Sequence, residues 1–369
     1  MLIYRSFIIA PIFAAAILLL AACFVLSGCY TFKQGITMLG YLNRAIPLES
    51  LRADGSASNI DDPDEAEKNR LFAETVMDIR SFAMEELGLK MSKNYTRYVQ
   101  IDRDYLAAVV SACAKDSFKR HEWKYPVVGA MPYKGFFNVD DARTEQNKLE
   151  KKGLDVWIRG VDAFSTLGWF KDPLYSYMRS YSVGRLADLI IHELLHATVF
   201  IKGQTQFNEE LAEFIGNKGS RLYIESRYGT GSDEYQRLFT SDADNQNFVI
   251  FLQGIASDLE ALYSSGKSKE EKLAGKEQII QTAKERFDAE YDSRFTNDNY
   301  RFFSELPVNN AYLDLYRLYY TTDNFFEGLY QKSGEDLNAF IAVAKTLAKK
   351  DSSGIHDPRI RLEKALGLE

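Results

Sequence analysis

Residues 191–196 read Ile191-His192-Glu193-Leu194-Leu195-His196 and contain the pattern His-Glu-x-x-His. On a helix, two histidines four residues apart project from the same face, one turn from each other. This spacing lets both imidazoles bind one Zn²⁺ ion, with Glu193 beside the open coordination position as a general base. The alternative is two surface histidines on an ordinary helix, but the flanking apolar residues indicate a helix buried on most sides. We therefore predict a zinc site at His192 and His196.

A catalytic zinc site takes a third protein ligand and leaves the fourth position to water. Downstream the chain reads Asn208-Glu209-Glu210. A second helix starting near Asn208 would return antiparallel and bring an acidic side chain back to the histidines. Neighbouring positions on a helix differ by about 100°, so only one of Glu209 and Glu210 can face the metal. The same stretch is also typical of a helix N-cap followed by two acids that interact favourably with the helix dipole.

His-Glu-x-x-His followed by Asn-Glu-x-x-Ala resembles the gluzincin metallopeptidases, in which the glutamate after asparagine is the third ligand. The resemblance implies a zincin-like fold with Glu209 as that ligand. It also implies that Glu213, one turn further along, is an acid that hydrogen-bonds a ligand histidine. Only 12 residues separate His196 from Glu209, fewer than in most gluzincins, so we expect a tight connection between the two helices.

A wider set of motifs resembles a family of predicted aminopeptidases among bacterial envelope lipoproteins. The motifs are Gly28-Cys29-Tyr30 and residues 126–137, 153–156, 165–173 and 309–312. The resemblance implies a membrane-anchored zinc metallopeptidase that removes N-terminal residues from short peptides by means of a zinc-activated water. The sequence has no Gly-x-Met-x-Asn signature, which holds the substrate amine in familiar aminopeptidases. A zinc endopeptidase, a cell-wall amide hydrolase and a non-catalytic metal-binding lipoprotein therefore stay open as alternatives.

Peptide hydrolysis also needs a second group that stabilises the oxyanion, commonly a tyrosine or histidine in such enzymes. One helical face carries Tyr312, Tyr316 and Tyr319, with Tyr320 next to them. We expect one of these tyrosines to stabilise the oxyanion. Aromatic packing in the core is the alternative for each. Residues 165–168 are expected to form either an edge strand that pairs with the substrate backbone or a plain turn after a strand.

The N-terminal residues 1–29 contain Arg5, an apolar run over 8–25 and the ending Leu26-Ser27-Gly28-Cys29. A short positive region, a hydrophobic stretch and small residues are typical of an export signal. The ending resembles the bacterial lipobox (26–29), in which the cysteine is diacylated, whereas a plain membrane helix is the alternative. We expect a lipid on Cys29 that anchors the protein in the bacterial cell envelope. Tyr30 in place of aspartate favours the outer membrane, with the protein facing the periplasm.

Composition sets the broad class. The chain has 369 residues, of which 46% are hydrophobic and 13% aromatic, so it can bury a sizeable core. A net charge of −7 gives no indication of a nucleic-acid partner. Of the three cysteines, Cys23 leaves with the signal and Cys29 takes the lipid. Cys113 then has no intramolecular disulfide partner, and we interpret it as a small buried hydrophobic residue and not as a nucleophile.

Hydrophobic periodicity predicts an α+β fold, in which a small mixed β-sheet is followed by a mainly helical lobe that carries the zinc helix. After the signal peptide we expect one domain over 30–369, with a helical part (30–90), a β-rich part (91–172) and a second helical part (173–369). The predicted helices are 30–51, 66–87, 183–202, 209–228, 233–264, 269–291, 311–320 and 334–349. The predicted strands are 95–101, 107–113, 125–137 and 156–166.

Overall fold

The computed structural model describes residues 30, 33–52, 62–125, 129–161, 172–319, 325–348 and 355–368. The predicted signal peptide with Cys29, the segment 165–168 and Tyr320 lie outside these residues, as does the side chain of Tyr319. Within the described ranges, no helix combines the length and the apolar character that crossing a bilayer requires.

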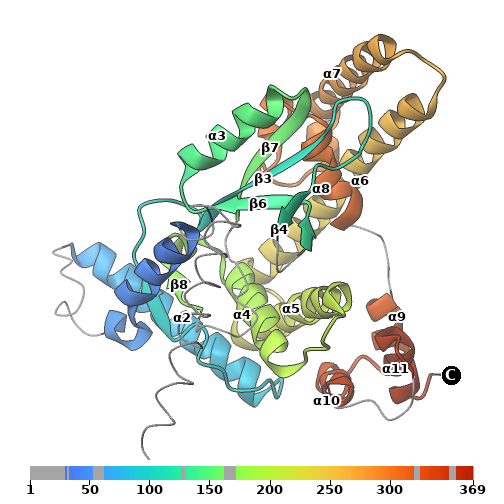
Figure 1. Cartoon of the computed structure of the whole chain (residues 1–369). Helices are drawn as coiled ribbons and strands as arrows, with labels where there is room; N and C mark the ends of the chain where they lie inside the picture. The colour runs from blue at the N-terminus through green and yellow to red at the C-terminus, as the bar shows by residue number, and fades with distance from the viewer. Residues whose placement is uncertain are drawn as a thin grey trace, which may run out of the picture.

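The α+β class is confirmed, and helices make up most of the molecule (Figure 1). The helices at its centre are α2 (Pro63–Glu85), α4 (Val183–Thr198) and α5 (Thr205–Tyr228). The long helices α6 (Asp233–Ser264) and α7 (Lys269–Arg294) pack together as a hairpin. The remaining helices are 33–44, α3 (Val139–Glu150), α8 (Asn310–Tyr319), α9 (Phe325–Lys332), α10 (Leu337–Leu347) and α11 (Pro358–Ala365), with short 3₁₀ helices η1 (Leu48–Arg52), η2 (Ser176–Ser180) and η3 (Arg301–Glu305).

Among the described residues, the strands form three small sheets, so the expectation of a single mixed sheet is wrong. The central sheet is antiparallel, in the order β6 (Tyr133–Phe136), β3 (Ala107–Ala114), β7 (Leu154–Val161). The second sheet contains β1 (Ile46–Pro47), β2 (Arg97–Val99) and β8 (Leu174–Tyr175), and its β2–β8 pair is parallel. The third is the hairpin of β4 (Trp123–Tyr125) and β5 (Gly129–Met131).

Helix α3 lies within the part of the chain expected to be β-rich and was not among the predicted helices. Asn138 caps it, because its side chain accepts hydrogen bonds from the backbone amides of Asp140 and Asp141. The helix connects β6 to β7 and packs on one face of the central sheet. There Ala142 and Leu149 join the inward-facing residues of β3 in a core. With one face covered by α3, the central sheet offers only its other face to the helical part.

That second face of the central sheet is joined to α7 and α8 by a buried polar network. Lys276 Nζ lies 2.7 Å from Asp155 Oδ2, and the two side chains are only 4% and 9% exposed. The same carboxylate accepts a hydrogen bond from the backbone amide of Asn310 at 3.0 Å. Beside this network, a second core of mainly aromatic side chains fills the space between α6, α7 and α8. Helix α8 therefore lies against the central sheet and α6.

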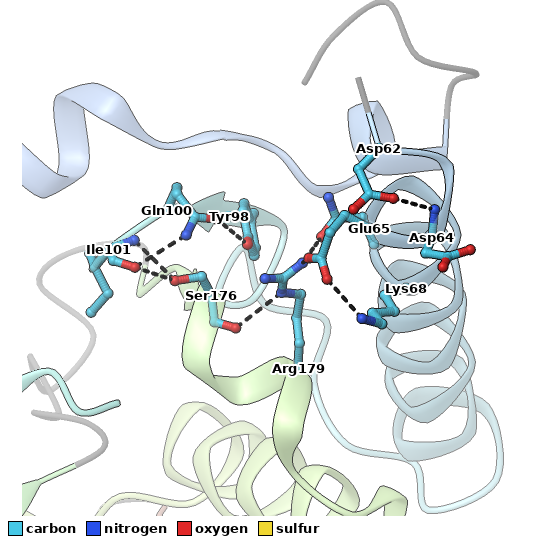
Figure 2. A network of polar contacts seen from close by, with 10 residues as sticks. Asp62, Asp64, Glu65, Lys68, Tyr98, Gln100, Ile101, Ser176 and Arg179 are labelled. Carbon is cyan, nitrogen blue, oxygen red and sulfur yellow. Dashed lines mark hydrogen bonds and ion pairs between the residues drawn. The ribbon is translucent and has the colours of Figure 1, made fainter. Parts of the chain in front are cut away.

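The chain that leads into α4 is fixed by the polar contacts drawn in Figure 2. The Ser176 hydroxyl donates to the Ile101 carbonyl at 2.8 Å and accepts from the Ile101 amide at 3.0 Å. The Arg179 guanidinium donates to Glu65 at 2.9 Å and to the buried Asn69 at 2.7 Å, both on α2. These bonds attach η2 to α2 and to the segment after β2, so the start of α4 has a defined position.

Candidate metal centre

Helix α4 carries the His-Glu-x-x-His motif. Ser182 caps the helix by accepting a hydrogen bond from the Arg185 amide. Ile190, Ile191, Leu194 and Leu195 are at most 1% exposed and belong to the largest core, so the expectation of a buried helix is confirmed. The helix ends at Thr198 and not at Lys202 as predicted. The β-branched Val199 adopts an extended conformation and buries its side chain in the same core, which stops the helix.

Helix α5 starts at Thr205, four residues before the predicted Glu209, so Asn208 is not the N-cap. Asn208 lies in the first turn and is 2% exposed. Its side-chain oxygen accepts from the Ile201 amide at 3.0 Å, and its side-chain nitrogen donates to the Ile201 carbonyl at 2.9 Å. Gly203 makes the turn between the helices with a φ of +79°, which favours glycine. The side chain of Asn208 therefore links the start of α5 to the residues after α4 and holds the expected tight connection in place.

The structure brings His192, His196 and Glu209 together. The two Nε2 atoms lie 3.1 Å apart. The Glu209 carboxylate lies 3.7 Å from His192 Nε2 and 3.5 Å from His196 Nε2. A tetrahedral zinc ion with bonds of about 2.0–2.1 Å places its ligand atoms roughly 3.3 Å apart. The three side chains therefore have the donor types and the spacing that one zinc ion requires.

Glu210 points elsewhere. Its carboxylate lies 2.6 Å from a guanidinium nitrogen of Arg359 on α11. It also accepts a hydrogen bond from Gln206 at 2.8 Å. Of the two glutamates that the helix geometry left open, the structure turns Glu209 toward the histidines and Glu210 toward the C-terminal helix.

The charges around this cluster suit a cation. Hydrogen bonds with His192 and His196 lower the pKa of Glu209 to about 2, so its carboxylate is anionic. Burial opposes the charged form of His192, but its hydrogen bond with Glu209 and the neighbouring acids outweigh burial and raise its pKa. Glu193 is 9% exposed, and burial raises the pKa of its carboxyl above the ordinary value. The cluster thus contains an anionic ligand group and, next to it, a carboxyl group that binds a proton more readily than usual.

Two glycines of α5 allow it to approach α4 closely. A Cβ atom on Gly216 would lie 2.7 Å from Asp188 Oδ1 and 3.2 Å from His192 Cβ. A Cβ atom on Gly219 would lie 3.0 Å from Ile191 and from Leu87. Larger residues would push the helices apart and so move Glu209 away from the histidines. The spacing Gly-x-x-Gly in the sequence indicates this close approach of the two helices, but it was not among the predictions.

Two further acids lie behind the histidines. Glu213 was expected from the resemblance, and burial raises its pKa while His192 opposes the shift. Asp188 was missed, although it stands one helical turn before His192 on the same face. Burial raises the pKa of Asp188 to about 6, again with His192 opposing the shift. Both acids are therefore near enough to interact electrostatically with His192.

The structure does not bring Tyr312 or Tyr316 of α8 to the histidines. Tyr312 is 4% exposed, and its ring centroid lies 4.6 Å from that of Trp157 on β7 and 5.3 Å from that of Tyr316. Tyr316 in turn contacts Phe248 of α6. Both side chains belong to the core between α6, α7 and α8, because α8 lies against the central sheet. Aromatic packing, the alternative considered from the sequence, describes both residues.

The role of Asn208 leads to a prediction. Replacing Asn208 by alanine removes the side-chain acceptor of the partly buried Ile201 amide and is expected to lower the free energy of unfolding by about 1–3 kcal/mol. Because the α4–α5 connection loosens, zinc affinity should fall as well. Urea denaturation and zinc titration measure the two effects. The exposed neighbour variant Gln206→Ala should stay within about 0.5 kcal/mol of the parent protein. Equal stability of both variants would show that the Asn208 side chain does not hold the connection.

A family model described as "Putative aminopeptidase" matches residues 29–356. The matched range includes both histidines and Glu209 but ends before α11, which supplies Arg359. No curated protein and no solved structure matches the chain.

Proposed function

The chain belongs to the family described as "Putative aminopeptidase", and we propose that it is a zinc-dependent enzyme that removes N-terminal residues from short peptides. The observation that carries the zinc part of this proposal is the geometry of His192, His196 and Glu209. Their donor atoms lie 3.1–3.7 Å apart, as ligands of a single tetrahedral ion would. The aminopeptidase part comes from the family.

Zinc bound to these three residues would supply Lewis-acid chemistry, activating water and polarising the scissile carbonyl. Glu193 stands next to His192, and its buried carboxylate takes the proton from the attacking water and later gives it to the leaving amine. Its raised pKa brings it closer to neutral pH, where a general base works best. Glu209 supplies negative charge to the ligand set. Glu213, one turn beyond Glu209, interacts electrostatically with His192 and would orient a ligand histidine.

The ligand set also supports an enzyme over a non-catalytic metal-binding lipoprotein. Structural zinc sites are usually closed by four protein ligands, whereas catalytic sites have three and keep one position open. In the described part of the chain, the group of His, Cys, Asp and Glu side chains close enough to share an ion has three members. This favours a catalytic site.

We further propose that a lipid on Cys29 attaches the enzyme to the outer membrane of a bacterial envelope. Tyr30, the residue after this cysteine, is the first described residue, and it packs directly on the folded protein. Its hydroxyl donates to the Gly135 carbonyl on β6, and its ring contacts Phe136. An anchor at Cys29 would therefore leave the molecule beside β6, with no flexible tether between lipid and protein.

The test is digestion of a peptide library by the full chain in detergent, followed by mass spectrometry. We expect release of single N-terminal residues, no cleavage of N-acetylated peptides, loss of activity with a zinc chelator and recovery when zinc is added back. Internal cuts would indicate the endopeptidase alternative, and products from cell-wall peptides would indicate the amide hydrolase. A zinc-loaded protein that cleaves none of these substrates would contradict the proposal that it is an enzyme.

A further inference from the structure

A small cavity lies on the face of the central sheet that α3 does not cover. Its walls include Ser111 and Cys113 of β3, Tyr133 of β6 and Arg159 of β7. Ser111 lies opposite Tyr133 in the β3–β6 register, so the two side chains share this face of the sheet. The cavity volume is about 30 Å³, room for roughly two water molecules. The cavity shares no residue with the histidine–glutamate cluster.

The acidic groups near this cavity already have partners. Asp314 of α8, also in the cavity wall, accepts a hydrogen bond from Arg120 Nε at 2.5 Å. The other oxygen of the same carboxylate lies 3.3 Å from Arg317. Arg317 also pairs with Glu260 at 2.7 Å. Asp314 and Glu260 are therefore neutralised by Arg120 and Arg317, and neither needs a further cation.

Arg159 adds a positive charge beyond these pairs. Its Nε atom is buried and, among the described residues, has no hydrogen-bond partner. A buried guanidinium nitrogen normally has an acceptor, because leaving a charged donor unsatisfied is costly. With Arg159 included, three guanidinium groups face two carboxylates, which leaves one positive charge. A small anion in the cavity would balance this charge and accept hydrogen bonds from the guanidinium group.

The other walls are neutral or can donate hydrogen bonds. Burial, followed by the charge of Asp314, raises the pKa of the Cys113 thiol to about 12, so it carries no negative charge at neutral pH. Ser111 and Tyr133, which also line the cavity, have neutral polar side chains. Neither Cys113 nor these two side chains would repel an anion.

We propose that this cavity binds a carboxylate group. Arg159 is its main partner, and Arg120, which Asp314 of α8 holds in the cavity wall, is the second. The planar guanidinium fork matches a carboxylate with two parallel hydrogen bonds. A carboxylate also fits the space of about two water molecules. The ligand is either a free small carboxylate or the carboxylate end of a longer molecule such as a peptide.

The test uses the full chain in detergent, stripped of zinc by a chelator so that the histidine cluster holds no ion that could bind an anion. Calorimetry with acetate, with trialanine and with trialanine amide measures binding. We expect saturable binding of trialanine but not of its amide. If acetate binds as well, a free carboxylate is a sufficient ligand. If trialanine binds and acetate does not, the ligand is the carboxylate end of a peptide. Either result supports the site. Binding of inorganic phosphate tighter than both carboxylates, or binding of none of them, would overturn the proposal.

Variants of Arg159 locate the binding. Arg159→Gln should weaken trialanine binding at least tenfold, and Arg159→Lys, which keeps the charge but loses the fork, should weaken it less. The matched control is Arg143→Gln on α3, whose side chain is 67% exposed, and it should bind as the parent protein does. Because Arg159 Nε has no partner to lose, the urea midpoint of Arg159→Gln should equal or exceed that of the parent. Undiminished binding, or a large loss of stability in both Arg159 variants, would refute the assignment.

Discussion

Replacing Glu193 by glutamine is expected to lower kcat for peptide hydrolysis by about 10²–10⁴-fold, the usual contribution of a general acid–base group. Glutamine has nearly the same shape but cannot take a proton from water. Because Glu193 is not one of the three ligand groups, zinc content should stay at the parent level. Steady-state kinetics on a short peptide and metal analysis of the same preparation measure the two quantities.

The matched control for this variant is Glu210→Gln. Glu210 lies near the same helix–helix junction but pairs with Arg359, away from the histidines. Its kcat should stay within a few-fold of the parent value. If Glu193→Gln retains both its zinc and its full kcat, Glu193 is not the base, and the proton acceptor is another group.

Replacing Glu209 by alanine is expected to reduce zinc affinity by more than the 10–100-fold typical of residues that only support a ligand. The reason is that Glu209 provides one of three donor atoms and the negative charge of the set. Competition with a fluorescent zinc chelator measures the affinity, and peptide hydrolysis should fall in parallel.

Glu210→Ala is the control here as well, since it changes the neighbouring residue by the same number of atoms. It removes the ion pair with α11 but leaves all three donor atoms in place, so zinc affinity should change little. Equal losses in the two variants would mean that the start of α5, and not the Glu209 carboxylate, determines metal binding. A loss in Glu210→Ala alone would contradict the ligand assignment.

Several parts of the fold and of the site could be predicted because they depend on local spacing. The four-residue interval of His192 and His196 fixes their angle around a helix, whatever else the chain does. The apolar residues around them indicated a buried helix, and they are buried. The α+β class followed from the alternating pattern of the middle segment and the helical periodicity after it.

Other parts could not be predicted, because residues far apart in the sequence decide them. Val199 ends α4 early because its side chain is buried in the core. Helix α3 is different, because its N-cap Asn138 is a local signal that the sequence carries and the prediction missed. Tyr312 shares its helical face with Tyr316, as the sequence indicated, but a helical face does not reveal its neighbour. That neighbour is Trp157 of the central sheet.

The sequence by itself determined that two histidines and a glutamate share one helix in an arrangement suited to zinc. Only the tertiary structure decided which glutamate of α5 joins them. Glu210 is held by Arg359, 149 residues further along the chain, and Gly216 lets the two helices approach closely. The physical reason is that helix geometry fixes angles between neighbours in sequence, whereas the distance between two helices depends on the side chains that pack between and around them.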